Sequence, residues 1–313
     1  MTSRCGWLVS TVVLTIFVVA CASRHAPATT PPHTAATPSG SAAAPSAPGA
    51  PAGGVACVEN IAFDGDPNGL LWDAAHARLV VTDSAHARLL AFSAEHGVSV
   101  LADIPPDEGK AGASLGQPVL DDGGELLVTR FGNGVTGGIV RIDANGTVGS
   151  VSGLDPERRR IGLASAEGRL FETYFVKKGA ERAGGVAEVR ADGPELDVAS
   201  FQKPVGVVAA GGALYVSDQD QNAIFRCATT AGATCTRFAT LTKPDLLAVG
   251  PHGSLFTGGR GGELRQIDRA GAVERVVAGS GEIRGVAWDG ARRVFFTRRA
   301  ADGRGVIGAC LLP

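Results

Sequence analysis

The 313-residue sequence has little net charge and few aromatic residues. Its 29 lysines and arginines are nearly balanced by 31 aspartates and glutamates, giving a formal charge of −2, and aromatic residues make up only 5% of the chain. Without an excess of positive charge, there is no electrostatic footprint for nucleic acid and no basic face for anionic lipid. We therefore expect no nucleic-acid partner.

The chain also lacks an apolar run long enough to cross a bilayer. Its most apolar stretch, residues 7–19 (WLVSTVVLTIFVV), has 13 uncharged residues, whereas a transmembrane helix needs about 20. Arg4 precedes the run without any acidic residue. A short apolar core behind a positive charge is typical of a signal peptide.

The run ends in Val18-Val19-Ala20-Cys21, which resembles the lipobox of bacterial lipoproteins. The resemblance implies that residues 1–20 are a removable lipoprotein signal peptide and that the thiol of Cys21 receives a lipid, which tethers the protein to a membrane. Because Ala22 rather than aspartate follows, it also implies the outer membrane if the host has two. An ordinary secretory leader cut near Ala20 or Ala22 is the alternative.

Residues 21–54 contain almost no large apolar side chains and are dominated by proline, alanine, serine and threonine. Such a segment cannot bury enough surface to offset its chain entropy. We expect it to be a lipidated, disordered linker, which leaves residues 55–313 as the folded domain of a cell-envelope lipoprotein.

The folded part contains six similar segments, each with a small-residue turn, an apolar strand, a turn and a second strand ending in a hydroxyl residue. The hydroxyls follow one another at intervals of 40 to 47 residues; they are Thr82, Thr129, Thr173, Ser217, Thr257 and Thr297. Four short strands with their turns fill about 40 residues, the size of a propeller blade. The repeat predicts an all-β fold, a six-bladed β-propeller, with an irregular seven-bladed ring as the alternative.

Two motifs carry a family resemblance. Residues 81–84 (VTDS) and 216–218 (VSD) resemble the NHL-type propeller repeat, and residues 204–207 (PVGV) resemble the SMP-30 or gluconolactonase-like propellers. The similarity extends from Asn68 to about Pro313. Its motifs are common to six-bladed rings, so it implies the fold more strongly than the function.

The sixth unit is short by about one strand, and residues 55–63 alternate like a strand. A ring must pair its first and last strands or leave an edge exposed. We therefore expect the N-terminal segment to join the last blade, which would place Cys57 beside Cys310 in a disulfide.

Cys227 and Cys235 flank a short turn between two predicted strands. A hairpin would set them on opposing strands, so we predict a second disulfide between them. The four cysteines allow two other pairings, but neither suits this topology. A zinc site is disfavoured because no close CxxC pair exists and an exported protein is oxidised.

Ligand-binding candidates come from two positions of the repeat, because propeller sites usually lie near the central axis. Before the first strand of each unit stand Asn68, Gln117, Ile161, Val205, Asp245 and Arg284. After the hydroxyls stand Asp83, Arg130, Tyr174, Asp218, Gly258 and Arg298. The polar members of both sets are our candidates, and we expect the sets at opposite ends of the channel.

SMP-30-like enzymes hold a divalent metal between a glutamate, an asparagine and an aspartate. The resemblance implies that Asp245 matches the aspartate, whereas Asn68 stands in place of the glutamate and Val205 in place of the asparagine. The alternative is a channel of mixed polar residues with an ion pair between Asp245 and Arg284. The run of three arginines at 158–160 is interpreted as a solvated edge, or alternatively as an anion site.

No catalytic residue can be assigned, since no clear Ser, His and acid set can be assembled from the chain. The leading hypothesis is a monomeric, cofactor-free, non-catalytic module that binds a small ligand or an envelope protein. The alternative is a lactonase or esterase of the SMP-30 type, with a degenerate site and one divalent cation such as calcium or zinc.

Overall fold

The computed structural model describes residues 55–106, 112–191, 194–278, 281–300 and 302–313. The predicted signal peptide, Cys21 and the linker lie outside these residues. Within the described ranges nearly all regular structure is antiparallel β-sheet, and helical turns occur only at Gly132–Gly134 and Pro251–Gly253. The all-β prediction is therefore confirmed. No helix in the described residues is long and apolar enough to span a membrane.

Of the strands in the described ranges, sixteen form four sheets of four strands each, and in each sheet the strands lie side by side in sequence order. The first two sheets consist of β2 (Pro67–Asp73), β3 (Arg78–Asp83), β4 (Arg88–Ser93) and β5 (Gly97–Asp103), then β6 (Leu115–Leu120), β7 (Leu126–Arg130), β8 (Gly138–Ile142) and β9 (Val148–Ser150). The next two consist of β10 (Arg159–Ala166), β11 (Arg169–Lys178), β12 (Glu181–Val189) and β13 (Leu196–Phe201), then β14 (Pro204–Ala210), β15 (Ala213–Asp218), β16 (Ala223–Cys227) and β17 (Cys235–Thr240).

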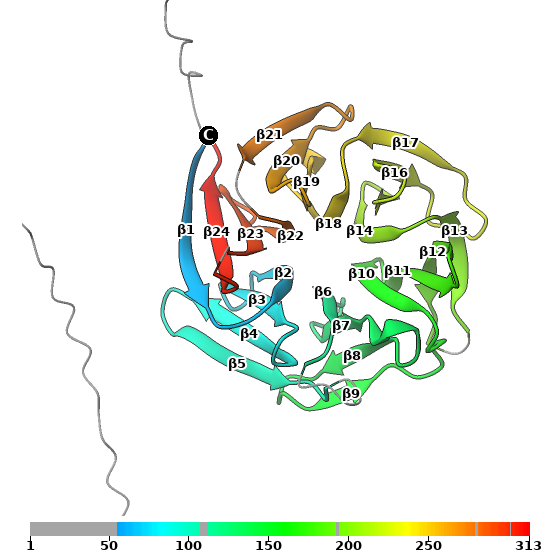
Figure 1. Ribbon diagram of the computed structural model, residues 1–313, viewed down its shortest axis with the longest axis horizontal. Helices are drawn as coiled ribbons and strands as arrows, with labels where there is room; N and C mark the ends of the chain where they lie inside the picture. The colour runs from blue at the N-terminus through cyan, green and yellow to red at the C-terminus, as the bar shows by residue number, and fades with distance from the viewer. Residues whose placement is uncertain (1–54, 107–111, 192–193, 279–280, 301) are drawn as a thin grey trace, which may run out of the picture. The chain divides into compact units, whose positions relative to one another are not determined.

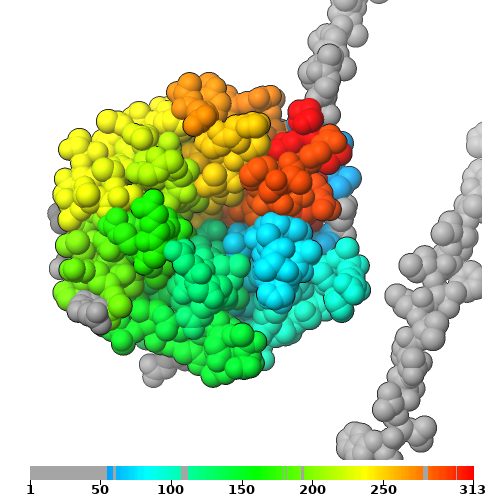
Figure 2. Space-filling model, turned by 180° about the vertical axis from the view of Figure 1, so that it is seen from behind, coloured from blue at the N-terminus to red at the C-terminus, as the bar shows by residue number. Residues whose placement is uncertain are grey.

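The other eight strands form one sheet. They are β18 (Pro244–Val249), β19 (Leu255–Gly259), β20 (Glu263–Ile267), β21 (Val273–Ala278), β22 (Ile283–Trp288), β23 (Arg293–Arg299), β24 (Gly305–Leu311) and β1 (Ala56–Phe63). The two halves of this sheet, β18–β21 and β22–β24 with β1, are joined by the single pair Gly259–Ile283 of β19 and β22. The sheets succeed one another around a common centre, toward which the first strand of each group lies (Figure 1). The coloured segments follow the same order when seen from behind (Figure 2).

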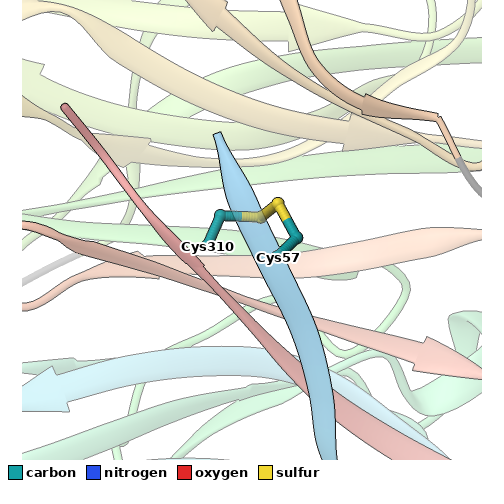
Figure 3. The surroundings of a disulfide bond; sticks show 2 residues. All are labelled: Cys57 and Cys310. Atoms are coloured by element: carbon teal, nitrogen blue, oxygen red, sulfur yellow. A yellow bond between two sulfur atoms is a disulfide. The ribbon is translucent and has the colours of Figure 1, made fainter. Parts of the chain in front are cut away.

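Both predicted disulfides are present. Cys57 of β1 lies opposite Cys310 of β24 in an antiparallel pair, and the two are bonded (Figure 3). Cys227 and Cys235 lie opposite each other on β16 and β17 and form the second bond. The first bond therefore joins residues 253 positions apart, whereas the second spans only 8.

Apolar side chains fill the space between neighbouring sheets. One cluster joins Val80 and Leu89 of the first sheet to Leu115, Val128 and Val140 of the second, and all five are at most 4% exposed. Burying a side chain of this size contributes about 1.5–3 kcal/mol relative to leaving it in water. Each sheet is thus held by its neighbours, which explains why the strands are apolar on both faces rather than strictly alternating.

The repeated hydroxyls link adjacent groups of strands through their backbones. Thr82 Oγ1 accepts a hydrogen bond from Gly69 N (2.7 Å) and donates to the carbonyl of Gly116 on β6 (3.2 Å). The equivalent donations to the next inner strand are Thr129 to Ile161 O, Thr173 to Val205 O, Ser217 to Asp245 O and Thr297 to Asn68 O, at 2.6–2.8 Å. Thr257 instead bonds to Leu246 O of its own group (3.0 Å). Five of the six repeated hydroxyls therefore link their group of strands to the next one, and the bond from Thr297 to Asn68 O links the last group to the first.

Glycine allows the inner strands to approach one another this closely. A Cβ atom on Gly69 would lie 2.2 Å from the carbonyl oxygen of Gly116, and one on Gly285 would lie 2.2 Å from that of Asn68. Real Cβ atoms do not come so near to backbone, so only glycine fits these two positions.

Replacing Thr297 with valine is expected to lower the free energy of unfolding by about 1–3 kcal/mol, because the buried Gly285 N–H and Asn68 carbonyl lose their partner. Thr297→Ser keeps the hydroxyl and should cost clearly less. Urea denaturation of the two variants measures the difference. Equal losses would show that the methyl group, not the hydroxyl bond, matters here.

Candidate functional site

A charged cavity lies where the N-terminal ends of the inner strands meet. Its volume is about 440 Å³, and β2, β6, β10, β14, β18 and β22 all contribute to its wall. These are the strands nearest the centre of the ring (Figure 1). The basic residues that line it are Arg159, Arg160, Lys177, Arg182, Lys203, Arg260 and Arg284. The acidic ones are Asp66, Asp245 and Glu282. The cavity is therefore cationic although the whole chain is nearly neutral.

Two of the cations that line the cavity, Arg159 and Lys177, have neither a side-chain hydrogen-bond partner nor an ion-pair partner among the described residues; a third, Lys203, also lacks a carboxylate partner there and donates to Gln219 Oε1 (2.7 Å). Within the described residues, no carboxylate pairs with Arg159 or Lys177, and the buried Nε of Arg159 has no hydrogen-bond acceptor. The Arg159 guanidinium lies 5.6 Å from the ring centre of Phe131 and 5.8 Å from that of Phe175. Aromatic faces fix a guanidinium without neutralising it. These two residues therefore leave uncompensated positive charge for an anionic or strongly polar ligand.

Arg284 binds two of the three acids. Its Nε donates to Glu282 (3.1 Å) and its NH1 group to Asp66 (3.3 Å). The expected ion pair between Arg284 and Asp245 is not formed, so that prediction is wrong. Asp66 and Glu282 lie just before the inner strands β2 and β22, and together they draw the guanidinium away from Asp245.

Asp245 is the buried acid of the cavity wall, with 6% of its surface exposed. Its carboxylate accepts hydrogen bonds from Leu246 N (3.0 Å) and Gln219 Nε2 (3.3 Å). Burial, helped by the nearby charge of Glu282, raises the pKa of Asp245 to about 7, even though Arg284 and Lys203 act in the opposite direction. A carboxyl with this pKa can both take and return a proton near neutral pH.

The cavity residues do not fit a divalent metal. Such an ion prefers several anionic oxygens, but of the three carboxylates among the described residues that line the cavity, Asp66 and Glu282 are bonded to Arg284. No cluster of three or more His, Cys, Asp or Glu in the described part of the chain could hold a metal. The guanidinium of Arg284 already compensates the charge of two of the cavity's carboxylates.

The structure separates Gln117 from the other candidates of its set. Asn68, Ile161, Val205, Asp245 and Arg284 line the charged cavity, whereas Gln117 lines a second cavity, at the opposite ends of the inner strands. The residue equivalent to Asn68 is Gly116, since its carbonyl receives the hydroxyl bond of the preceding group. Our alignment is wrong by one residue here, and in a strand that shift turns the side chain away.

The second set of candidates lies at the same end of the inner strands as the charged cavity, because the second strand of each group runs antiparallel to the first. The expectation that the two sets occupy opposite ends of the channel is therefore wrong. The second set supports this cavity rather than lining it. Asp83 accepts a bond from the backbone of Asp66 (2.9 Å) and Asp218 from that of Lys203 (3.2 Å). Both aspartates are fully buried, and each holds the residue that enters the charged cavity before an inner strand. Of the remaining candidates Tyr174, Arg130 and Arg298, none lines either axial cavity.

The arginine run at 158–160 is not a solvated edge, and that interpretation is wrong. Arg160 is fully buried and pairs with Glu172 and Glu195. Arg158 lies over the ring of Tyr174 at 3.7 Å, and Arg159 enters the charged cavity. Arg160 finds its carboxylates on β11 and before β13, 12 and 35 residues away, which no local pattern could reveal.

Sequence reasoning also missed Lys203, Glu282 and Asp66 as cavity residues. Each immediately precedes an inner strand. That shared position was the available signal: residues entering the first strand of a unit lie at the same mouth.

No protein-family model and no curated protein sequence matches the chain. Several solved structures do match the chain. A gluconolactonase from Xanthomonas campestris superposes with a TM-score of 0.68 at 21% identity, over 83% of this chain and 90% of that one. The calcium-binding protein regucalcin from Agrobacterium tumefaciens gives 0.62 at 16%, over 80% and 92%. A virginiamycin B lyase from Staphylococcus aureus gives 0.58 at 15%, over 83% and 99%.

These comparisons define the class of the fold. The chain has the propeller fold that gluconolactonases and regucalcin also have. At such identities the likeness carries the fold, and the chemistry has to be argued from the residues of the cavity.

Proposed function

We propose that this protein hydrolyses a small lactone or ester in the charged cavity, with Asp245 as the acid–base group. The observation that carries the proposal is a buried carboxyl with a pKa of about 7 on the wall of an otherwise cationic cavity. The likeness to gluconolactonases supports the substrate class. We therefore prefer the lactonase or esterase, which was the alternative hypothesis from the sequence, to a non-catalytic binding module. Our proposal omits the divalent cation of that alternative, because the cavity's donor residues do not suit one.

The reaction needs one proton shuttle and one anion stabiliser. Ionised Asp245 takes a proton from water, whose oxygen adds to the carbonyl carbon of the substrate. The ring C–O bond then breaks, and Asp245 returns the proton to the leaving oxygen. Lys203 and Arg284, whose charges act on Asp245, stabilise the negative oxygen of the intermediate. Arg159 and Lys177 bind the polar remainder of the substrate and the carboxylate of the product.

Asp245→Asn should lower kcat for hydrolysis of glucono-1,5-lactone by about 10²–10⁴-fold, the usual contribution of a general base. Gluconate binding should persist, because the cations remain. A pH-stat assay measures the first effect and titration calorimetry the second. Unchanged turnover in Asp245→Asn would contradict the assignment.

Binding without chemistry is the second candidate function, favoured by the two unpartnered cations. In that case gluconate would bind and Arg159→Met would weaken its binding, but no lactone would be turned over. The same pair of assays therefore separates the two functions.

We also propose that the ring consists of six blades. The eight-stranded sheet would count as two blades, since only one residue pair joins its halves. The pairing of β1 with β24 and the bond from Thr297 to Asn68 support closure between the chain ends of the domain.

A lipid on Cys21, which lies outside the described residues, remains our proposal for location: residues 55–313 would stand off the membrane on the linker, as a monomer in the cell envelope. Cys21→Ser should release the protein from the membrane fraction of its host while leaving the domain folded. Retention of that variant in membranes would contradict the tether. An envelope protein as an additional partner remains a proposal.

A further inference from the structure

The second axial cavity is chemically unlike the first. Its volume is about 460 Å³, and the C-terminal halves of all six inner strands line it, at residues 70–72, 117–120, 163–165, 208–209, 247–249 and 286–288. None of the described residues that line it is charged, and its side chains are mostly Leu, Val and Ala with two tryptophans, Trp72 and Trp288. A cavity of this size, apolar with a few polar groups, is typical of a site for a small organic molecule.

Two residues on this cavity's wall, Gln117 and Trp288, each have a buried polar atom without a hydrogen-bond partner among the described residues. Gln117 is 7% exposed, and its Oε1 accepts no hydrogen bond. The orientation of the amide is fixed, because its Nε2 donates to Leu70 O (3.2 Å) and Pro118 O (3.4 Å). The buried Nε1 of Trp288 likewise lacks an acceptor. Leaving such a buried group unpaired is unfavourable, and an acceptor and a donor are both open here.

We propose that this apolar cavity, lined by Gln117, Trp72 and Trp288, is a second ligand site that binds a small aromatic molecule carrying a hydroxyl group. A hydroxyl both donates and accepts, so it can donate to the open Gln117 oxygen or accept from the open Trp288 N–H. An aromatic ring matches the two indoles and the aliphatic wall. The absence of charge on the lining rules out the anionic class that suits the first cavity. This site is independent of the proposed hydrolysis.

The natural fluorophores report on this site directly. The chain has three tryptophans; two line the cavity, and Trp7 lies in the predicted signal peptide. Titrating the full chain with 4-ethylphenol should therefore give a saturable change in tryptophan emission. Ethylbenzene, which lacks the hydroxyl, should bind about five- to tenfold more weakly, the value of one neutral hydrogen bond. Arg159→Met, in the other cavity, should leave both titrations unchanged.

Gln117→Met removes the acceptor at similar volume and should reduce the preference for 4-ethylphenol over ethylbenzene to about twofold or less. A measurement on the unmodified chain avoids any folding defect: the Trp288 indole N–H signal in a ¹⁵N-correlated NMR spectrum should shift with 4-ethylphenol and much less with ethylbenzene. The proposal is overturned if 4-ethylphenol gives no saturable change at millimolar concentration. It is also overturned if both probes bind equally well or the indole signal does not move.

Discussion

Removing the disulfide between Cys57 and Cys310 is expected to lower the free energy of unfolding by up to about 5 kcal/mol. The bond joins residues 253 positions apart, and the entropy that a cross-link removes from the unfolded chain grows with the length of the loop that it closes. It also holds β1 on β24, which is the only strand that β1 pairs with in the described residues. Guanidinium denaturation of Cys57→Ala/Cys310→Ala measures the loss.

The other disulfide is the matched control. Cys227 and Cys235 are 8 residues apart, so the same relation predicts only about 2–3 kcal/mol for Cys227→Ala/Cys235→Ala. Both double variants remove two buried or half-buried sulfurs from paired strands, so the difference between them isolates the loop length. If the 227–235 pair costs as much as the 57–310 pair, the bond across the chain ends is not what holds the domain together.

Arg160→Met should lower the free energy of unfolding by about 3–5 kcal/mol at pH 8, because it leaves Glu172 and Glu195 without their buried partner. Burial already holds the pKa of Glu172 well above its usual range, with Arg160 acting against that shift. Arg158→Met is the control. Its guanidinium is partly exposed and lies farther from both carboxylates, so we expect a smaller loss.

The pH dependence of Arg160→Met has a definite sign. A carboxyl whose pKa is raised by folding binds more protons in the native than in the unfolded state, so stability falls as the pH rises through that window. Without Arg160 the pKa of Glu172 rises further, and the loss should be smaller at pH 5 than at pH 8. A loss that is independent of pH would show that Glu172 does not carry the penalty. Unfolding curves at the two pH values decide this.

The sequence was sufficient to predict the features that depend on spacing along the chain. The hydroxyls at 40 to 47 residues located the second strands correctly, because four short strands fill that interval whatever their side chains. Cys227 and Cys235 could be paired from one hairpin, and Cys57 with Cys310 from the missing strand of the last unit. The hydroxyls' bonds to the next inner strand were not foreseen, since they depend on how sheets pack.

The register of the inner strands and the burial of individual side chains could not be predicted from spacing along the chain. The turn between the first two strands differs in length from unit to unit, so counting from Thr129 could not distinguish Gly116 from Gln117 as the cavity residue. Three consecutive arginines indicate solvent exposure locally, but Arg160 is compensated by carboxylates from two other segments. Asp245 was found through its position in the repeat, yet its raised pKa comes from burial and from Glu282, which only the fold brings near.

The most direct test of the central proposal is the pH profile of kcat/KM for glucono-1,5-lactone, measured above the spontaneous rate in the presence of EDTA. If Asp245 is the base, kcat/KM should rise tenfold per pH unit below the pKa and level off above about pH 7, with chelator having no effect. Asp245→Asn should lose this dependence together with the activity. A profile with no inflection near pH 7, activity abolished by EDTA, or no turnover of the lactone would contradict the account.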